Sequence, residues 1–293
     1  FGRGEITEEA FIGVLKINKD NNMKRYECFS YWDEDLLLDL RLNILNNFVE
    51  YFVIVEGNKT WQNNSKKLKF NKDNFSDFKH KIMYIPVEDM PDGNNPYLRE
   101  NHQRNAISRG LNGANDDDHI IVSDLDEIPN PKKIQSFNKN MKYAVFKQMH
   151  FYYKINFQSK LNPFWYGSSI CVKQYLKSPQ WLRNLKFKKR PFLRLDKFRL
   201  NNIIDDGGWH FCNLKSPEQL LYKYKNLCET NDPTVVKEQI DKKFLNLDEI
   251  KKRINNGSDI IGRKENFKPI DLDDKFPNYI LKNKLHLKEW IVN

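Results

Sequence analysis

Residues 118–129 read DHIIVSDLDEIP, a short apolar run followed directly by two aspartates. A continuous apolar run of four to eight residues that stops at a polar turn is typical of a strand buried on both faces of a sheet. In open α/β sheets, ligands collect where such strands end. The stretch therefore predicts a central strand whose carboxyl end places Asp124 and Asp126 in a crevice.

Similar apolar runs alternate with helical patterns on both sides of this strand. Further strands are predicted at 26–31, 52–55 and 82–87, and helices at 35–46 and 97–111. The second half adds aromatic strand-like segments at 143–153 and 165–175, a helix opening at Ser216-Pro217 and running to about Cys228, and a short helix at 248–255. This alternation predicts an α/β fold with a mostly parallel central sheet flanked by helices.

Residues 1–22 read differently from the rest, because a short apolar patch at 10–15 gives way to a polar run that ends before Met23. We expect Met23 to be the natural start and 1–22 to be a leader or extension outside the core. No internal repeat or Gly/Ser linker interrupts residues 23–293. These residues are therefore predicted to form a single domain.

The composition restricts the possible partners without choosing one. The 293 residues carry a formal net charge of +10, which favours an anionic partner such as a nucleotide diphosphate, an acidic glycan, a membrane surface or nucleic acid. The lysines are spread along the chain and no zinc-finger or RNP-like pattern accompanies them, so nucleic-acid binding is not expected. The four cysteines lack CxxC spacing and are expected to be buried thiols. No apolar run approaches the roughly 18 residues of a membrane span.

The two aspartates have the chemistry of a site for a hard cation. One residue separates Asp124 from Asp126, so a turn can direct both carboxylates towards one point. Mg²⁺ and Mn²⁺ take one or two protein carboxylates and complete their coordination with water and phosphate oxygens. A metal here would neutralise charge on a departing diphosphate. The alternative is an ordinary solvated acidic turn.

A glycine-centred segment, DDGGWHF at 205–211, is a second candidate. Its glycines would let backbone approach a ligand closely, and Trp209 could stack on a sugar or a base. His210 could be a third metal ligand through a neutral imidazole. The alternative is a glycine turn entering a strand, with His210 as a hydrogen-bonded core residue.

Two further groups could contact a nucleotide. Arg99 or Arg104 could bind a diphosphate through the guanidinium fork, although Glu100 and Arg104 are also spaced for an ion pair on one helix face. Glu56 and Asn58, at the end of a predicted strand, could hydrogen-bond uracil or ribose, or could equally cap a turn.

Taken together, these segments resemble glycosyltransferase family 17. The similar segments, in the same order, are YECF (26–29), DLLLDLRLN (35–43), FVIVE (52–56), RE (99–100), QRN (103–105), SDLDEIP (123–129), GGWHF (207–211), GSD (257–259) and Arg263. The resemblance runs from about residue 23 to the C-terminus.

The resemblance implies a GT-A-type catalytic domain over 23–293, a UDP-sugar donor such as UDP-GlcNAc, a glycan acceptor, Mn²⁺ or Mg²⁺, and inversion at the anomeric carbon. Asp124 and Asp126 would then form the metal and diphosphate site, with His210 as a ligand. Inversion requires a general base. Glu127 is the first candidate for it, with Asp206 and Glu229 as alternatives.

The sequence also departs from the family pattern. A Ser/Ala-His-x-Glu pattern is expected after the helix that comes after GGWHF, whereas this chain reads LCETN at 227–231, which points to a different acceptor. The membrane helix that anchors Golgi members is missing from the sequence as given. The expectation is a cytoplasmic bacterial or viral enzyme, or a soluble catalytic fragment of an anchored one. The alternatives are a metal-dependent nucleotidyltransferase or phosphatase and, with less support, an anionic-polymer-binding protein.

Overall fold

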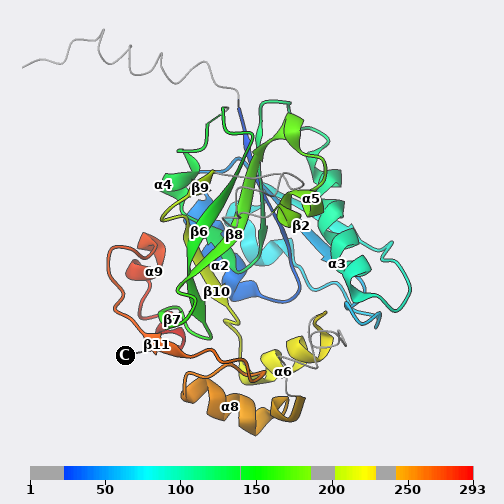
Figure 1. The fold of residues 1–293 in the computed structure, drawn as a ribbon. Helices are drawn as coiled ribbons and strands as arrows, with labels where there is room; N and C mark the ends of the chain where they lie inside the picture. Colours follow the sequence, from blue (N-terminus) through cyan, green and yellow to red (C-terminus); the bar gives the residue numbers. More distant parts are fainter. Residues whose placement is uncertain (1–22, 139, 186–201, 229–241, 293) are drawn as a thin grey trace, which may run out of the picture.

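The computed structural model describes residues 23–138, 140–185, 202–228 and 242–292. The predicted leader at 1–22 and the candidate base Glu229 lie outside these residues. Among them, the chain forms one sheet with helices on both faces and a separate group of helices beyond one end of the strands (Figure 1).

The sheet contains eleven strands within the described residues, and eight of them follow the order β11-β7-β6-β8-β4-β1-β2-β3. Their bounds are β1 Arg25–Ser30, β2 Tyr51–Gly57, β3 Ile82–Val87, β4 His119–Asp124, β6 Tyr143–Tyr152, β7 Phe157–Ser159, β8 Phe164–Val172 and β11 Phe267–Pro269. The other three are β5 Glu127–Pro129, which pairs with β10 Gly208–Cys212, and β9 Ile203–Ile204, which pairs with β6.

The prediction of an α/β fold is confirmed, but the sheet is mixed. Strands β3, β2, β1 and β4 are parallel neighbours, as the first half of the sequence predicts. Strand β8 then pairs antiparallel with both β4 and β6, and β7 pairs antiparallel with β6 and β11. The physical reason is the length of the connections, because strands joined by short loops, as β6, β7 and β8 are, can return only in the antiparallel direction.

Helices cover the two faces of the sheet (Figure 1). Helices α2 (Asp35–Leu45) and α9 (Asn278–Lys282) pack on one face, over a core that includes Leu38 and Ile280. Short 3-10 turn η2 (Ala106–Leu111) and helix α5 (Pro179–Asn184) pack on the other, through Ile107 and Leu182. Both sets of side chains are fully buried, so the sheet has an apolar core on each face.

The remaining helices are short. Their bounds are α3 Pro96–Asn105, α4 Pro131–Ile134, α6 Pro217–Asn226 and α8 Leu247–Asn255, with 3-10 turns η1 Lys72–Phe78, η3 Lys173–Tyr175, η5 Lys242–Phe244 and η6 Lys288–Trp290. The helix expected at 97–111 is thus divided into α3 and η2. The capping signal before α6 is confirmed, since the Ser216 hydroxyl accepts from the Gln219 amide while the Gln219 side chain accepts from the Ser216 amide.

One glycine sets the position of strand β10. Gly208 has φ +126°, and a Cβ there would overlap the carbonyl oxygen of Ile128 on β5. Only glycine combines this conformation with so close an approach. As a result β10 lies between β5 and β6, where His210 is the register partner of both Glu127 and His150.

Candidate active site

A pocket of about 250 Å³ opens where strands β1 and β4 end. The last residues of these strands, Ser30 and Asp124, are register partners in the sheet and both line the pocket. Its walls come from the segment after β1, the turn 124–127, and helix α6, which contributes Tyr222 and Lys223. The crevice therefore lies at the place that the strand pattern predicts.

A buried arginine beneath the pocket holds the 124–127 turn. Arg41 on α2 donates from Nη2 to the carbonyl of Asp124 at 2.8 Å and from Nε to the carbonyl of Leu125 at 3.2 Å. It also forms a fully buried ion pair with Glu27 on β1, whose carboxylate accepts from the Ser123 hydroxyl at 2.8 Å. Burial raises the pKa of Glu27 to about 7, even though Arg41 and Ser123 lower it. The turn is thereby fixed by charge-assisted hydrogen bonds.

Asp124 lies between two arginines. Arg104 on α3 approaches one carboxylate oxygen and Arg183 on α5 the other, each through Nη2 at 3.0 Å. Burial raises the pKa of Asp124, but the two guanidinium groups outweigh it and hold that pKa well below its usual range. Arg104 also pairs with Glu100 at 2.9 Å, as the i,i+4 spacing predicts. Arg104 thus makes the predicted ion pair and also lines the pocket, where it could contact a diphosphate.

Asp126 and His210 meet on the opposite side of the turn. The Nε2 atom of His210 lies 3.4 Å from an Asp126 carboxylate oxygen, and both residues line the pocket. Burial favours the neutral form of each group, yet their mutual attraction prevails: the pKa of Asp126 is lowered and that of His210 is raised well above its usual value. The structure therefore brings together the two sequence motifs, DLDE and GGWHF, which lie far apart in the sequence.

Glu127 lines the pocket but is only 1% exposed. Its carboxylate accepts from the Asp124 amide at 3.0 Å, from Trp165 Nε1 at 2.8 Å and from Arg183 Nη1 at 2.8 Å. These donors come from three separate segments and converge on one side chain. Glu127 therefore connects the turn to strand β8 and to helix α5.

Three of the predicted nucleotide contacts lie outside the residues that line the pocket. Glu56 is fully buried, pairs with Lys66 and accepts from the amides of Lys69 and Phe70 at 2.8 and 3.0 Å. Asn58 donates to the Glu88 carbonyl at 3.1 Å. Arg99 is 1% exposed and donates to the Trp61 and Gly93 carbonyls at 2.7 and 2.6 Å. In this structure each of them fastens a loop.

Two residues of the glycine-centred segment also lie away from the pocket wall. Trp209 is buried and donates from Nε1 to the Lys275 carbonyl at 3.0 Å. Asp206 is 83% exposed and lies 3.6 Å from Lys133. Of this segment, His210 is the residue that lines the pocket.

The pocket also contains residues that the sequence patterns did not single out. Trp32 lies against Trp61 and Tyr222, with ring centroids 5.7 and 6.4 Å apart, and all three rings line the pocket. Lys215, which pairs with Asp33, and Lys223 add positive charge. A useful signal is an aromatic residue directly after a predicted strand, as Trp32 is after 26–31, but nothing in the sequence pairs Trp32 with the other two rings.

Comparison with known proteins identifies the family of this chain. The profile of glycosyltransferase family 17 matches residues 18–291. This chain belongs to that family, and the resemblance expected from the motifs is confirmed.

Three curated relatives carry the same name, β-1,4-mannosyl-glycoprotein 4-β-N-acetylglucosaminyltransferase. The rat protein is 24% identical over 281 residues, covering 84% of this chain and 50% of its own length. The human and mouse proteins match at the same identity and cover 51% and 50% of their own lengths. The chain thus spans about half the length of the curated relatives it matches. No helix in the described part of the chain has the length and hydropathy needed to cross a membrane.

Proposed function

We propose that this chain transfers N-acetylglucosamine from UDP-GlcNAc to a hydroxyl group of a glycan acceptor, with inversion, and that its fold is of the GT-A type. The names of the relatives support the sugar and the acceptor class. The observation that carries the proposal is the position of Asp124 and Asp126 in a strand-end pocket bordered by cationic and aromatic side chains. A nucleoside diphosphate needs both kinds of contact.

The carboxylates of the turn fit a hard divalent ion, Mn²⁺ or Mg²⁺, since such ions prefer oxygen ligands. Asp126 is the better placed of the two, because its carboxylate faces His210 whereas both oxygens of Asp124 are engaged by arginines. Asp126, supported by Asp124, would hold the ion. When bound, the ion would neutralise charge on the departing UDP.

The side chains of the protein would perform the remaining binding steps. Arg104 and Lys223 line the pocket next to the turn and supply positive charge for the diphosphate. Burial alone would lower the pKa of Lys223, but the nearby Cys212 and Asp126 outweigh it and raise that pKa above its usual value, which favours the charged form. Trp32 and Trp61 present aromatic faces for the base or for a sugar ring.

The deprotonation of the acceptor requires a base with a lone pair directed at the acceptor. The lone pairs of Glu127 are occupied by the Asp124 amide, Trp165 and Arg183, which favours a positioning role for Glu127 over that of the base. Asp206 is exposed and remote from the pocket lining, and Glu229 lies outside the described residues. Measurements on a Glu127 variant therefore decide between these two roles.

The direct test is product analysis. The purified chain is incubated with UDP-GlcNAc, Mn²⁺ and a panel of N-glycan acceptors, and both UDP release and acceptor mass are measured. We expect UDP to be released and the acceptor to gain one N-acetylhexosamine. Asp126→Ala should abolish both while the far-UV circular dichroism is unchanged. Release of GlcNAc-1-phosphate, with transfer of the uridylyl group, would instead identify a nucleotidyltransferase, and no turnover or binding of any UDP-sugar would refute the proposal.

A further inference from the structure

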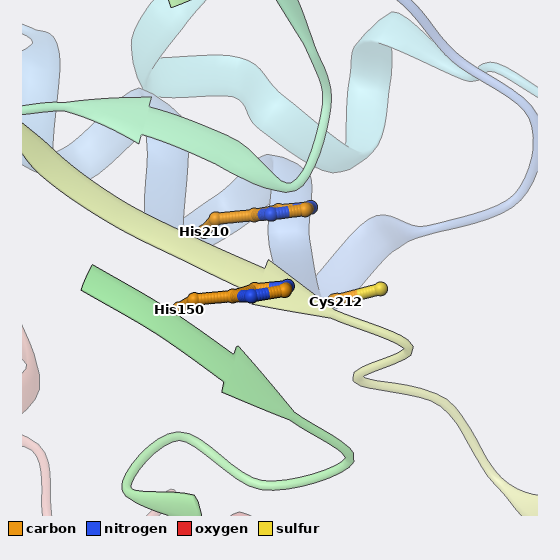
Figure 2. Close-up of side chains that lie close together, drawn as sticks. All are labelled: His150, His210 and Cys212. Carbon is orange, nitrogen blue, oxygen red and sulfur yellow. The ribbon is translucent and has the colours of Figure 1, made fainter. Parts of the chain in front are cut away.

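Strands β6 and β10 place three metal-binding side chains on one face of the sheet beside the pocket. His210 and Cys212 are two residues apart on β10, so their side chains point to the same face. His150 on β6 is the register partner of His210 in the adjacent parallel strand. One nitrogen from each histidine and the Cys212 sulfur lie within 4.8 Å of one another. Figure 2 shows the two imidazoles one above the other, with the cysteine beside their outer edges.

The two histidines are prepared for this role by their hydrogen bonds. His150 Nδ1 lies 3.0 Å from the Asn162 carbonyl, which can only accept, so the proton sits on Nδ1 and Nε2 keeps its lone pair. His210 Nε2 lies 3.4 Å from the Asp126 carboxylate, and an ion bound at Nδ1 would displace the proton that Nδ1 carries in the charged ring. Both His150 Nε2 and His210 Nδ1 are buried and have no hydrogen-bond partner among the described residues. Buried nitrogens without a partner are costly unless something binds them.

We propose that His150, His210 and Cys212 form a binding site for a borderline-soft divalent ion such as Zn²⁺. Two imidazoles and one thiolate make a donor set that suits zinc and does not suit Mg²⁺. Three protein ligands leave a fourth position for water or another ligand.

The two imidazoles must tilt towards each other to share one ion. The rings stack with centroids 4.8 Å apart and 4° between their planes, and the lone pair of each ligating nitrogen lies in its own ring plane. Ligand atoms around a tetrahedral zinc lie roughly 3.5 Å apart. Side-chain rotations that tilt the two rings and bring the ligating atoms about 1 Å closer together would close the site, and Cys212 is only half-buried.

The site differs chemically from the proposed carboxylate site for Mn²⁺ or Mg²⁺. Asp126 does not ligate the soft ion here. Its carboxylate lies 3.4 Å from His210 Nε2, a position that carboxylates behind zinc-bound histidines commonly occupy. The inference does not depend on the proposed function, because it predicts metal binding whether or not any sugar is transferred.

The test is zinc binding by the full chain after removal of any affinity tag. We expect one equivalent of zinc after dialysis, measured by plasma mass spectrometry, and a sulfur-to-cobalt charge-transfer band when Co²⁺ replaces zinc. Cys212→Ala and His150→Gln should each weaken binding at least about tenfold. Cys212→Ala should also remove the band, whereas Cys171→Ala, which deletes a thiol elsewhere in the sheet, should change neither readout.

Asp126→Asn provides a second readout. We expect it to retain one equivalent of zinc with an affinity lowered about 10- to 100-fold, the effect of losing the carboxylate behind a ligating histidine. Wild-type protein that binds no zinc overturns the proposal. So does zinc binding that Cys212→Ala and Cys212→Ser leave unchanged. The cobalt spectrum of wild-type protein decides the matter if either variant folds poorly.

Discussion

Arg183 holds one oxygen of Asp124 at 3.0 Å through Nη2, while its Nη1 lies 2.8 Å from the carboxylate of Glu127. One guanidinium therefore joins the acid that ends strand β4 to the acid that begins strand β5. Its side chain is 12% exposed, and burial of so many charges requires this mutual pairing. The geometry of the turn thus depends on helix α5, which lies far along the chain from it.

Replacing Arg183 should destabilise the fold as well as the site. Arg183→Met leaves Glu127 buried without its ionic partner, and we expect the free energy of unfolding to fall by about 3–5 kcal/mol in urea denaturation. Arg183→Lys should recover part of this loss, because charge is restored without the guanidinium fork. Arg109→Met removes an exposed ion pair with Asp89 and should cost about 1 kcal/mol or less. Equal losses for Arg183→Met and Arg109→Met would contradict this role.

Glu127→Gln separates a positioning residue from a general base. The side-chain NH₂ group of the glutamine would face an N–H group of Trp165 or Arg183, and two donors cannot hydrogen-bond to each other. We therefore expect the free energy of unfolding to fall by about 1.5–3 kcal/mol. The exposed Glu289→Gln change serves as the control and should have little effect. A variant of unchanged stability and UDP affinity whose kcat drops by about 10²–10⁴ would instead make Glu127 the base.

Trp32 should contribute to nucleotide binding through its ring. Stacking of a base on an aromatic side chain contributes about 1–3 kcal/mol, so Trp32→Ala should raise the Kd of UDP about tenfold in calorimetry. Tyr166→Ala is a matched control, because Tyr166 is 45% exposed on strand β8 and does not line the pocket. An equal Kd for the two variants would exclude a stacking role for Trp32.

His119 makes the fold sensitive to acid. Burial, with a smaller effect of Arg25, lowers the pKa of His119 from its usual 6.5 to about 4. The unfolded chain therefore binds a proton at higher pH than the folded one. The neutral His119 ring therefore makes its full contribution to the free energy of unfolding above about pH 6.5, and this contribution is lost as the pH falls towards 4.

His119→Phe should consequently flatten the dependence of Tm on pH between 6.5 and 4, since the ring packs edge-on against Phe137 and phenylalanine can keep that contact. The exposed His80→Gln substitution should leave the profile as in the wild type. An identical slope in His119→Phe and wild type would show that this histidine is not responsible.

The parallel half of the sheet was predictable because its signals are local. The strand expected at 118–123 is found at His119–Asp124, and the helix expected at 35–46 is found at Asp35–Leu45. The apolar runs there are continuous and each ends at a polar turn, so the pattern marks both the strand and its end. The antiparallel half was not predictable in the same way, since its strand order depends on pairing between β4 and β8, which no local pattern encodes.

The candidate site was predictable in part, because the motifs that carry their own chemistry meet at one pocket. Asp124, Asp126, His210 and Arg104 all line the pocket. Arg183 was missed because α5 has six residues and no helical periodicity to mark it, and its contact with Asp124 arises only from packing. Glu56 follows a correctly predicted strand, but its carboxylate turns to the amides of Lys69 and Phe70, a choice made by a loop whose path the sequence pattern does not define.

The most direct measurement of the central claim is a crystal structure of the chain with UDP and Mn²⁺. The account predicts that the diphosphate lies in the pocket at the ends of β1 and β4, with Mn²⁺ on the Asp126 carboxylate and Arg104 within reach of a phosphate oxygen. A diphosphate bound outside this pocket, or a metal ion that contacts neither Asp124 nor Asp126, would contradict it.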